Sequence, residues 1–299
     1  MIPIPRRSMF QRLLFCTDLS DGINRLAHFV PSLAAAGVKQ ITFLHSVPYD
    51  GGTIPRPDAK AIAAAKAQLE VALENVPAGV NVAVEIESGR PSDAILRIAK
   101  QTQADLIVLG MPIRSQVWEK LFGSTAMAVC QNTTTPIMVF RPQLLSTYTS
   151  EELVLRCQHL FRGILIPYDG SDSAKHVVEL VKQRVVDCPS PKLELCHLCW
   201  VVEDAGRRGV PPEYFTEPAR KALEEAKIQL EAVGVGVEAE VRQGDPLLEL
   251  LLVAQMANVS AIATSSNSMG KLQELSIPSF TRELLHRSWY PIIYFPSRR

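Results

Sequence analysis

The chain has 299 residues, 47% hydrophobic and 21% charged, which is enough apolar material for about two domains and excludes a largely disordered protein. Lysine plus arginine number 31 and aspartate plus glutamate number 31, so the zero net charge provides no global field to attract nucleic acid or an anionic membrane. Six cysteines are too few for a disulfide-stapled secreted scaffold, and no apolar run reaches the ~18 residues of a membrane span. We therefore expect a cytoplasmic protein with no nucleic-acid partner and no membrane insertion.

Short apolar runs alternate with helical patterns along the first half of the chain. The patterns predict strands at 13–17, 41–47, 80–87, 105–110 and 137–140, and helices at 23–36, 59–73, 92–102 and 124–131. Near-continuous Val, Ile and Leu runs that alternate with helices are typical of a parallel sheet covered by helices on both faces. The first half is therefore expected to be a doubly wound α/β domain with a five-stranded parallel sheet.

The same pattern recurs in the second half. Residues 10–21 (FQRLLFCTDLSD) recur as 161–172 (FRGILIPYDGSD) at an offset of 151, and residues 135–140 (TPIMVF) recur as 290–295 (YPIIYF) at an offset of 155. The difference of four residues indicates an insertion in a surface loop. We expect two homologous domains, 8–142 and 159–297, joined by a connector at 143–158 that contains a short capped helix beginning at Ser150.

Glycines and hydroxyl side chains follow the strands of the first domain. Asp18 ends the first strand, Gly110 ends the fourth, and residues 123–125 (Gly-Ser-Thr) open a helix after the loop at 111–122. In a doubly wound sheet, ligands bind beyond the carboxyl ends of the strands where the strand order reverses. Glycine permits close approach of the backbone, and the free N–H groups of a helix start bind anions. The sequence therefore predicts a phosphate-bearing ligand at this edge.

These features also have structural interpretations. Asp18 and its counterpart Asp169 are of the residue type that caps a following helix, and residues 123–125 also fit an ordinary helix start. Both interpretations stay open at this point.

Two further motifs fall on predicted strands of the domains. His45 and His197 are interpreted as matching residues inside apolar strands, where a structural histidine is more common than a catalytic base. Cys196 and Cys199 have CxxC spacing, but residues three apart on a strand face opposite sides, so we expect core packing rather than a metal or redox pair.

The glycine and hydroxyl residues resemble the motif of the universal stress protein family, whose nucleotide-binding members carry Gly-x2-Gly-x9-Gly-Ser/Thr after the fourth strand. Here the stretch reads Gly110-x2-Ile113-x9-Gly123-Ser124, with Thr17 and Asp18 ahead of it. The resemblance covers about residues 8–142 and 159–297. It implies a stress-response protein with two tandem Rossmann-like domains, each with the strand order 3-2-1-4-5.

The resemblance also implies an adenine nucleotide (ATP, ADP or AMP) in the first domain, with Mg²⁺ accompanying ATP. By this resemblance Asp18, next to Thr17, would contact the adenine or ribose, and Ser46 would border the adenine through its backbone. The implied phosphate-holding residues are Gly110, Arg114, Gly123, Ser124 and Thr125.

Both domains depart from the family pattern. Ile113 stands in place of the second motif glycine, and its side chain would intrude where the triphosphate lies. In the second domain the motif positions hold Ser265, Ser268, Pro278 and Ser279, and Pro278 lacks the N–H that a phosphate would need. We expect the second domain to be a poor triphosphate site or none.

The last strand of each domain, Ile137–Phe140 and Ile292–Phe295, would be an exposed apolar sheet edge if the domain stood alone. The family dimerises through this strand, so we expect the two strands to pair in an internal pseudo-dimer. A homodimer of two chains is also compatible with this pattern.

Three functions are compatible with the sequence. The favoured one is a binding module that senses an adenine nucleotide in the first domain and signals to a protein partner by ordering the 111–122 loop. The alternative is a scaffold of the same fold that acts through protein–protein contacts without a nucleotide. An enzyme comes third, because residues 17–21 read TDLSD whereas ATP-cleaving relatives of the fold carry Ser-Gly-Gly-x-Asp-Ser there. We expect no catalysis beyond the slow ATP hydrolysis that some family members show.

Overall fold

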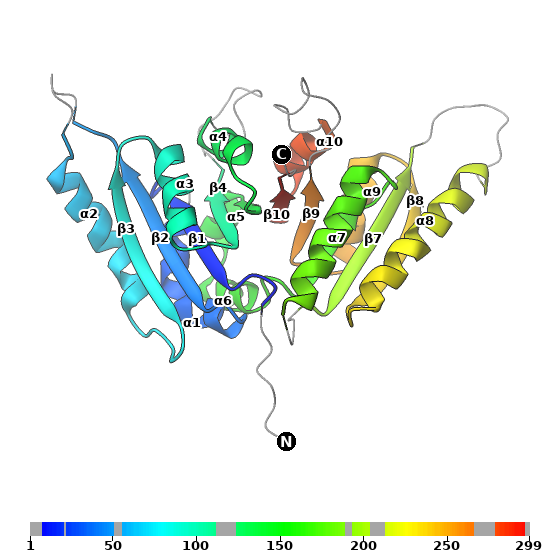
Figure 1. Cartoon of the computed structure of the whole chain (residues 1–299), viewed down its shortest axis with the longest axis horizontal. Helices are drawn as coiled ribbons and strands as arrows, with labels where there is room; N and C mark the ends of the chain where they lie inside the picture. Colours follow the sequence, from blue (N-terminus) through cyan, green and yellow to red (C-terminus); the bar gives the residue numbers. More distant parts are fainter. Residues whose placement is uncertain are drawn as a thin grey trace. The chain divides into compact units, whose positions relative to one another are not determined.

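The computed structural model describes residues 8–20, 22–50, 56–111, 124–188, 193–203, 213–265 and 279–296. The chain divides into two compact units. The N-terminal unit is Phe10–Gln158, and the C-terminal unit combines His159–Ser297 with the residues up to Met9. Each unit contains one parallel sheet with helices on both faces (Figure 1), which confirms the predicted α/β class.

The strand order of the N-terminal unit is β3-β2-β1-β4-β5, as predicted. All its strand pairs are parallel. The strands are β1 (Arg12–Thr17), β2 (Gln40–Val47), β3 (Asn81–Ser88), β4 (Leu106–Gly110) and β5 (Ile137–Phe140). The order reverses between β1 and β4, so the carboxyl ends of these two strands flank the switch point at which ligands bind in such sheets.

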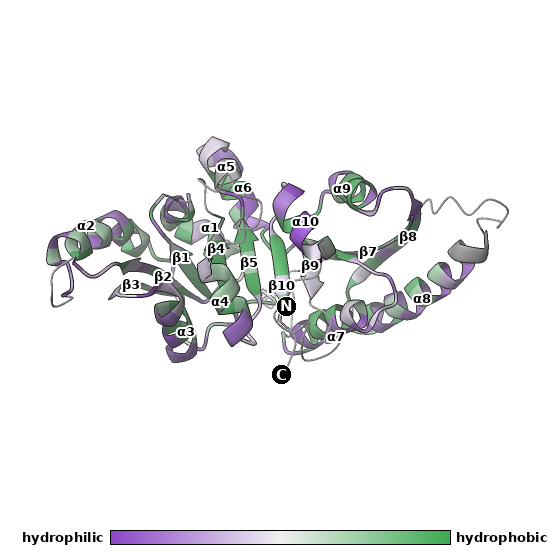
Figure 2. Cartoon of the chain, turned by 90° about the horizontal axis from the view of Figure 1, so that it is seen from above, coloured by the Kyte–Doolittle hydropathy of each residue, from purple (hydrophilic) through white to green (hydrophobic). Residues whose placement is uncertain are grey.

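Helices cover both faces of this sheet. The helical segments are η1 (Ile23–Phe29), α1 (Val30–Ala35), α2 (Ala59–Leu69), η2 (Glu70–Leu73), α3 (Pro91–Gln101), α4 (Ser124–Asn132), α5 (Pro142–Thr147) and α6 (Ser150–Gln158). Helices α1 and α2 lie on one face, and α3 and α4 lie together on the other (Figure 2). The residues expected as a connector form α5 and α6, of which α6 packs against α1. A reciprocal pair of hydrogen bonds between Thr149 and Glu152 caps α6.

The helix predicted at 23–36 is interrupted. A 3-10 helix runs to Phe29, and an α-helix restarts at Val30 with Pro31 in its first turn. Proline has no N–H to donate to the preceding turn, so a continuous helix would lose a hydrogen bond at Pro31, whereas a helix start tolerates proline. The helix predicted at 59–73 similarly becomes 3-10 over its last turn, Glu70–Leu73.

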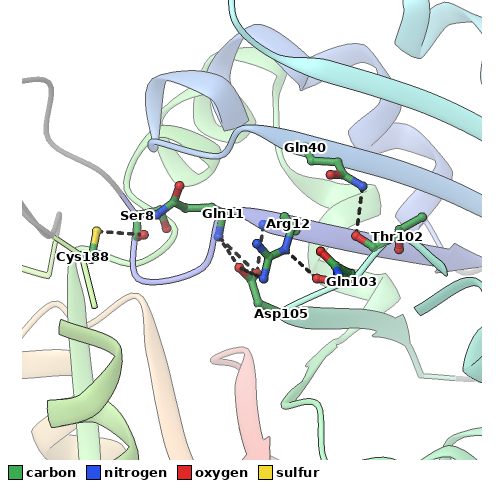
Figure 3. Close-up of polar contacts among 8 residues, drawn as sticks. All are labelled: Ser8, Gln11, Arg12, Gln40, Thr102, Gln103, Asp105 and Cys188. Carbon is green, nitrogen blue, oxygen red and sulfur yellow. Dashed lines mark hydrogen bonds and ion pairs between the residues drawn. The ribbon is translucent and has the colours of Figure 1, made fainter. Parts of the chain in front are cut away.

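A hydrogen-bonded cluster fixes the amino ends of β1 and β4 (Figure 3). The carboxylate of Asp105 accepts hydrogen bonds from the backbone N–H groups of Gln11 at 3.1 Å and Arg12 at 2.9 Å. The Arg12 side chain in turn donates to the Gln103 carbonyl at 2.6 Å. Polar anchoring is thus provided at the sheet end opposite to the switch point.

The C-terminal unit repeats the same topology, β8-β7-β6-β9-β10, again with parallel pairs. Its strands are β6 (Gly163–Pro167), β7 (Leu195–Val202), β8 (Gly236–Gln243), β9 (Ala261–Ser265) and β10 (Ile292–Phe295). Its helices are α7 (Asp172–Val186), α8 (Glu213–Glu231), α9 (Pro246–Met256) and α10 (Ser279–Arg287). The predicted pairing of Ile137–Phe140 with Ile292–Phe295 stays a prediction.

The four-residue insertion lies between α7 and β7. Ala35 ends α1 and Val186 ends α7, an offset of 151, whereas Gln40 begins β2 and Leu195 begins β7, an offset of 155. The connection at 36–39 is therefore replaced by the longer one at 187–194. The insertion is a connection between elements, as predicted. Among the described residues, no helix is long and apolar enough to cross a membrane.

Candidate nucleotide site

The chain turns sharply at the carboxyl end of β1. Thr17 is buried, and its hydroxyl accepts a hydrogen bond from the Leu19 N–H at 2.9 Å. The exposed carboxylate of Asp18 accepts from both the N–H and the hydroxyl of Ser20, each at 2.8 Å. Leu19 itself has a φ of 65°, a conformation that costs a side-chain-bearing residue of order 1–3 kcal/mol and that occurs often at functional sites. The turn therefore holds Asp18 in a fixed, solvent-facing position at the switch point.

Asp18 and Asp169 are not the helix caps that the structural interpretation proposed. Asp18 closes a local turn, and the following 3-10 helix begins at Ile23, with Gly22 at its N-cap position and no side-chain cap. Asp169 likewise accepts from the Ser171 N–H at 3.0 Å, and Ser171 is the residue that caps α7. The reason is spacing, because an Asx turn bonds two residues onward and leaves the helix to start later.

The carboxyl end of β2 lies beside that of β1. His45 pairs with Thr17 in the sheet, and the His45 Nδ1 lies 2.8 Å from the Thr17 carbonyl oxygen. The half-buried Ser46 donates its hydroxyl to the Gly89 carbonyl at 3.0 Å. A Cβ on Gly89, which has a φ of 114°, would lie 3.1 Å from the Tyr49 ring. The Ser46 hydroxyl therefore links β2 to the turn that leads into α3.

The carboxyl end of β4 completes this edge of the sheet. Gly110 pairs with Phe140 of β5, and the next residue, Met111, donates its N–H to the Phe140 carbonyl at 3.0 Å. Helix α4 begins at the exposed Ser124, followed by the partly exposed Thr125. Ile113, Arg114 and Gly123 lie outside the described residues. The structure therefore places Thr17, Asp18, Ser46 and Gly110 at one edge of one sheet, at the ends of β1, β2 and β4.

The corresponding edge of the C-terminal unit is closed by side chains. Ser265, at the position of Gly110, donates its hydroxyl to the Phe295 carbonyl at 2.7 Å. The Ser173 hydroxyl donates to the Ser265 carbonyl at 3.1 Å, so the start of α7 is bonded to the end of β9. The residue that corresponds to Ser173 at the 151 offset is Gly22. The switch point therefore carries two glycines in the N-terminal unit and two hydrogen-bonded serines in the C-terminal unit.

Aromatic side chains fill a second part of that edge. Tyr168 and Trp200 form an edge-on pair with ring centroids 6.2 Å apart. The indole also covers the turn after β6, since a Cβ on Gly170 would lie 3.1 Å from its ring. Ser268 and Pro278 lie outside the described residues, as does the side chain of Ser279.

His45 and His197 are not matching residues. Thr17 pairs with His45 in one unit, whereas Leu165, the counterpart of Leu14, pairs with His197 in the other. Leu14 pairs with Thr42, so His197 corresponds to Thr42 and His45 to Trp200. The equivalence at an offset of 152 was wrong because the insertion shifts the offset to 155 on this strand. The buried His197 places its Nε2 3.0 Å from Glu238 Oε2, although neither ring nitrogen has a well-aligned hydrogen bond.

The two cysteines of the CxxC motif are core residues. Cys196 and Cys199 lie on β7 and are almost completely buried as free thiols. Burial raises the pKa of each thiol to about 12, which disfavours the reactive thiolate. Within the described part of the chain, no cluster of three or more His, Cys, Asp or Glu side chains is arranged to hold a metal ion.

Comparison with known proteins decides the family. The model of the universal stress protein family matches residues 9–141 and again residues 160–296. The chain belongs to the universal stress protein family. The two matches make it a tandem member of the universal stress proteins.

Curated and solved universal stress proteins are similar to it. Universal stress protein MJ0531 of Methanocaldococcus jannaschii is 22% identical over 167 residues, which cover 52% of this chain and 94% of that protein. Universal stress protein YxiE of Bacillus subtilis is 29% identical over 150 residues, covering 45% of this chain and 98% of that protein. The structure of a universal stress protein from Archaeoglobus fulgidus covers 96% of this chain and 97% of its own, with a TM-score of 0.63 and 19% identity, which supports the tandem fold.

Sequence reasoning missed two residues of the switch point. Leu19 and Gly22 are of interest because their φ angles are positive, 65° and 77°. A signal was present in the repeat, because Leu19 aligns with Gly170 and Gly22 aligns with Ser173. Comparing the two halves of a tandem universal stress protein residue by residue would have singled out both positions.

Proposed function

We propose that the N-terminal unit of this universal stress protein binds an adenine nucleotide and passes its occupancy to a protein partner through the 111–122 segment. The observation that carries the proposal is the contrast between the two switch points. Gly22 and Gly110 leave the backbone of one edge without side chains, whereas Ser173 and Ser265 bridge the other. A phosphate needs close approach to backbone N–H groups, which glycine permits.

The polar groups at the same edge fit a nucleotide. The Asp18 carboxylate is exposed, held by the Ser20 turn, and has acceptor capacity left for a ribose hydroxyl or an adenine amino group. Helix α4 begins at Ser124, and the unpaired N–H groups of a helix start favour a negative charge. A universal stress protein has been crystallised in complex with cAMP. The proposal for this chain rests on its own residues.

A calorimetric titration tests the proposal. ATP, ADP, AMP and cAMP are titrated into the purified chain with and without Mg²⁺, and we expect saturable heat for at least one of them. Gly110→Ser gives the N-terminal unit the residue of the C-terminal one and should weaken binding by about tenfold or more, which is about 1.4 kcal/mol. The matched control, Ser265→Gly, should leave the affinity unchanged.

A second pair of variants locates the base and ribose. Asp18→Ala should lower the affinity of the nucleotide that binds, whereas Asp169→Ala removes the same Asx turn from the C-terminal unit and should not. Equal effects of the two aspartate variants would place the nucleotide elsewhere. An absence of heat with every nucleotide would contradict binding altogether.

The side chains that fill the switch point of the C-terminal unit favour a second candidate function, without a nucleotide, for that unit. Ser173, Ser265 and the Tyr168–Trp200 pair occupy the edge where a nucleotide would lie. We propose that this unit serves as a scaffold that acts through protein–protein contacts. The proposed activity of the whole chain is thus binding without catalytic turnover, which an ATP hydrolysis assay on the same samples checks.

A further inference from the structure

Helix α9 of the C-terminal unit exposes a stripe of large apolar side chains. Leu248, Leu252 and Met256 are 51%, 46% and 76% exposed. They are spaced four residues apart, so they follow one another along a single face of the helix. The opposite face packs on the sheet through buried residues that include Leu250 and Val253. We refer to Leu248, Leu252 and Met256 as the α9 stripe.

The repeat shows that the fold itself does not require the α9 stripe. Helix α3 is the counterpart of α9, with the same length of 11 residues and an offset of 155. Its residues at the three stripe positions are Asp93, Arg97 and Gln101, all exposed. Arg97 forms an ion pair with Glu87 at 2.8 Å. The corresponding helix therefore exposes charged and polar side chains in the N-terminal unit and apolar side chains in the C-terminal unit. Exposed apolar stripes of this kind mark contact sites.

The α9 stripe itself carries no charge, which favours an uncharged, apolar partner surface. Glu249 is the only charged residue of α9, and its carboxylate is 3.0 Å from Arg242 Nε. A basic or an acidic partner would find no free complementary charge on the helix itself. Two copies of the α9 stripe, in contrast, meet without repulsion between like charges.

The spacing of the α9 stripe is also self-complementary. Leu248 and Met256 lie four residues on either side of Leu252. In an antiparallel pair of α9 helices related by a two-fold axis, Leu252 meets Leu252 of the second copy, and Leu248 meets Met256. The antiparallel arrangement also sets the two helix dipoles in opposite directions, which is the favourable one.

We propose that the α9 stripe is a homodimer contact, with two copies of this chain packed through antiparallel α9 helices. Three side chains cover less than the ~800 Å² that each partner buries in a standard stable interface, so the dimer is weak and depends on concentration. This contact is independent of the nucleotide proposal.

Sedimentation velocity of the full chain between about 1 µM and about 200 µM tests the proposal, a range that covers weak association. We expect the wild-type chain to shift toward dimer as the concentration rises. Leu252→Glu places two carboxylates at the two-fold axis and should give a monomer throughout. Ile228→Glu is the matched control, because Ile228 is 57% exposed on α8 and should not affect the dimer.

Cysteine cross-linking tests the antiparallel register. Leu252→Cys should form a disulfide-linked dimer on mild oxidation. Leu248→Cys alone should not, but it should cross-link when mixed with Met256→Cys. The wild-type chain is the control for the native thiols.

Four results would overturn the proposal. These are a wild-type monomer at every concentration, a dimer that survives Leu252→Glu, self-cross-linking of Leu248→Cys in place of Leu252→Cys, and a monomer that binds phosphatidylcholine vesicles through Leu252. The last would assign the α9 stripe to a lipid surface.

Discussion

The turn after the first strand of each unit contains a residue with a positive φ angle, but the residue type at that position differs between the units. After β1 the αL position is occupied by Leu19, with a φ of 65°, and after β6 it is occupied by Gly170, with a φ of 72°. Glycine adopts this positive φ angle without the conformational cost that a side chain brings. It also leaves room for the Trp200 ring, which packs directly against Gly170. The glycine in the C-terminal unit is therefore explained by packing of the indole, and the leucine in the N-terminal unit leaves a strained turn beside Asp18.

Gly170→Ala should destabilise the C-terminal unit by more than the cost of placing alanine at a positive φ angle. The positive φ costs about 1 kcal/mol for alanine, and the Cβ would lie 3.1 Å and 3.2 Å from two carbons of the Trp200 ring, which must then move. We expect a total loss of about 2 kcal/mol in unfolding free energy. Hydrogen exchange of β6 and β7 amides measures the loss within that unit.

Gly234→Ala is the control for Gly170→Ala. Gly234 lies in the same unit with a φ of 85°, but a Cβ there would meet nothing within 4 Å. It should lose only the backbone contribution of about 1 kcal/mol. Equal losses of unfolding free energy for the two variants would show that the Trp200 ring can move away from the added Cβ without destabilising the unit.

At the scale of elements, an ion pair links β3 to α3. Arg97 donates to Glu87 at 2.9 Å, and this hydrogen bond, aided by the attraction of the two charges, lowers the pKa of Glu87 against the opposing effect of burial. A lowered carboxyl pKa contributes stability above the pKa of the unfolded chain, and the contribution is lost as the pH falls through the folded pKa. Because Arg97 is exposed and Glu87 is only partly buried, solvent screens the pair and we expect this contribution to be small.

Arg97→Gln should raise the pKa of Glu87 toward its ordinary value. An NMR titration of the Glu87 carboxyl carbon measures the shift directly. The stability difference between wild type and Arg97→Gln should be present near neutral pH and vanish in acid, where Glu87 is protonated in both chains. Lys66→Gln breaks an exposed ion pair between Lys66 of α2 and Glu70 of η2 and should leave the Glu87 titration unchanged. An unaltered Glu87 pKa in Arg97→Gln would show that another group sets it.

The elements could be predicted from the sequence because their signals are local. Apolar runs placed both ends of each strand of the N-terminal unit within one residue, and the strand order followed from the family resemblance. Pro31 was visible too, but the periodic apolar pattern on both sides of it concealed the break.

The candidate site was less predictable. Asp18 and Gly110 stand out as residue types, whereas Leu19 and Gly22 matter through φ angles that a single residue identity does not reveal. The Ser173–Ser265 bridge needs two segments 92 residues apart, which only the fold brings together.

At the scale of the whole molecule, the chain changes units between Met9 and Phe10. Ser8 is fully buried, and its carbonyl accepts a hydrogen bond from the Cys188 thiol of the C-terminal unit at 3.3 Å (Figure 3). Three residues later, the Gln11 N–H donates to Asp105 of the N-terminal unit. The longer connection at 187–194 thus provides a partner for the start of the chain. A C-terminal fragment that begins at 159 would lack part of its own unit.

Adjacent substitutions should therefore destabilise different units. Met9 is 4% exposed and Phe10 is fully buried, so replacing either with alanine should cost about 2–5 kcal/mol. Hydrogen exchange followed by mass spectrometry assigns the loss to a unit: Met9→Ala should accelerate exchange in β6 and α7, and Phe10→Ala in β1 and β4. Because the two residues are neighbours, an effect of the N-terminal segment as a whole would appear in both variants alike. Acceleration in the same unit for both would place the boundary elsewhere, and the C-terminal unit would then be complete without Ser8 and Met9.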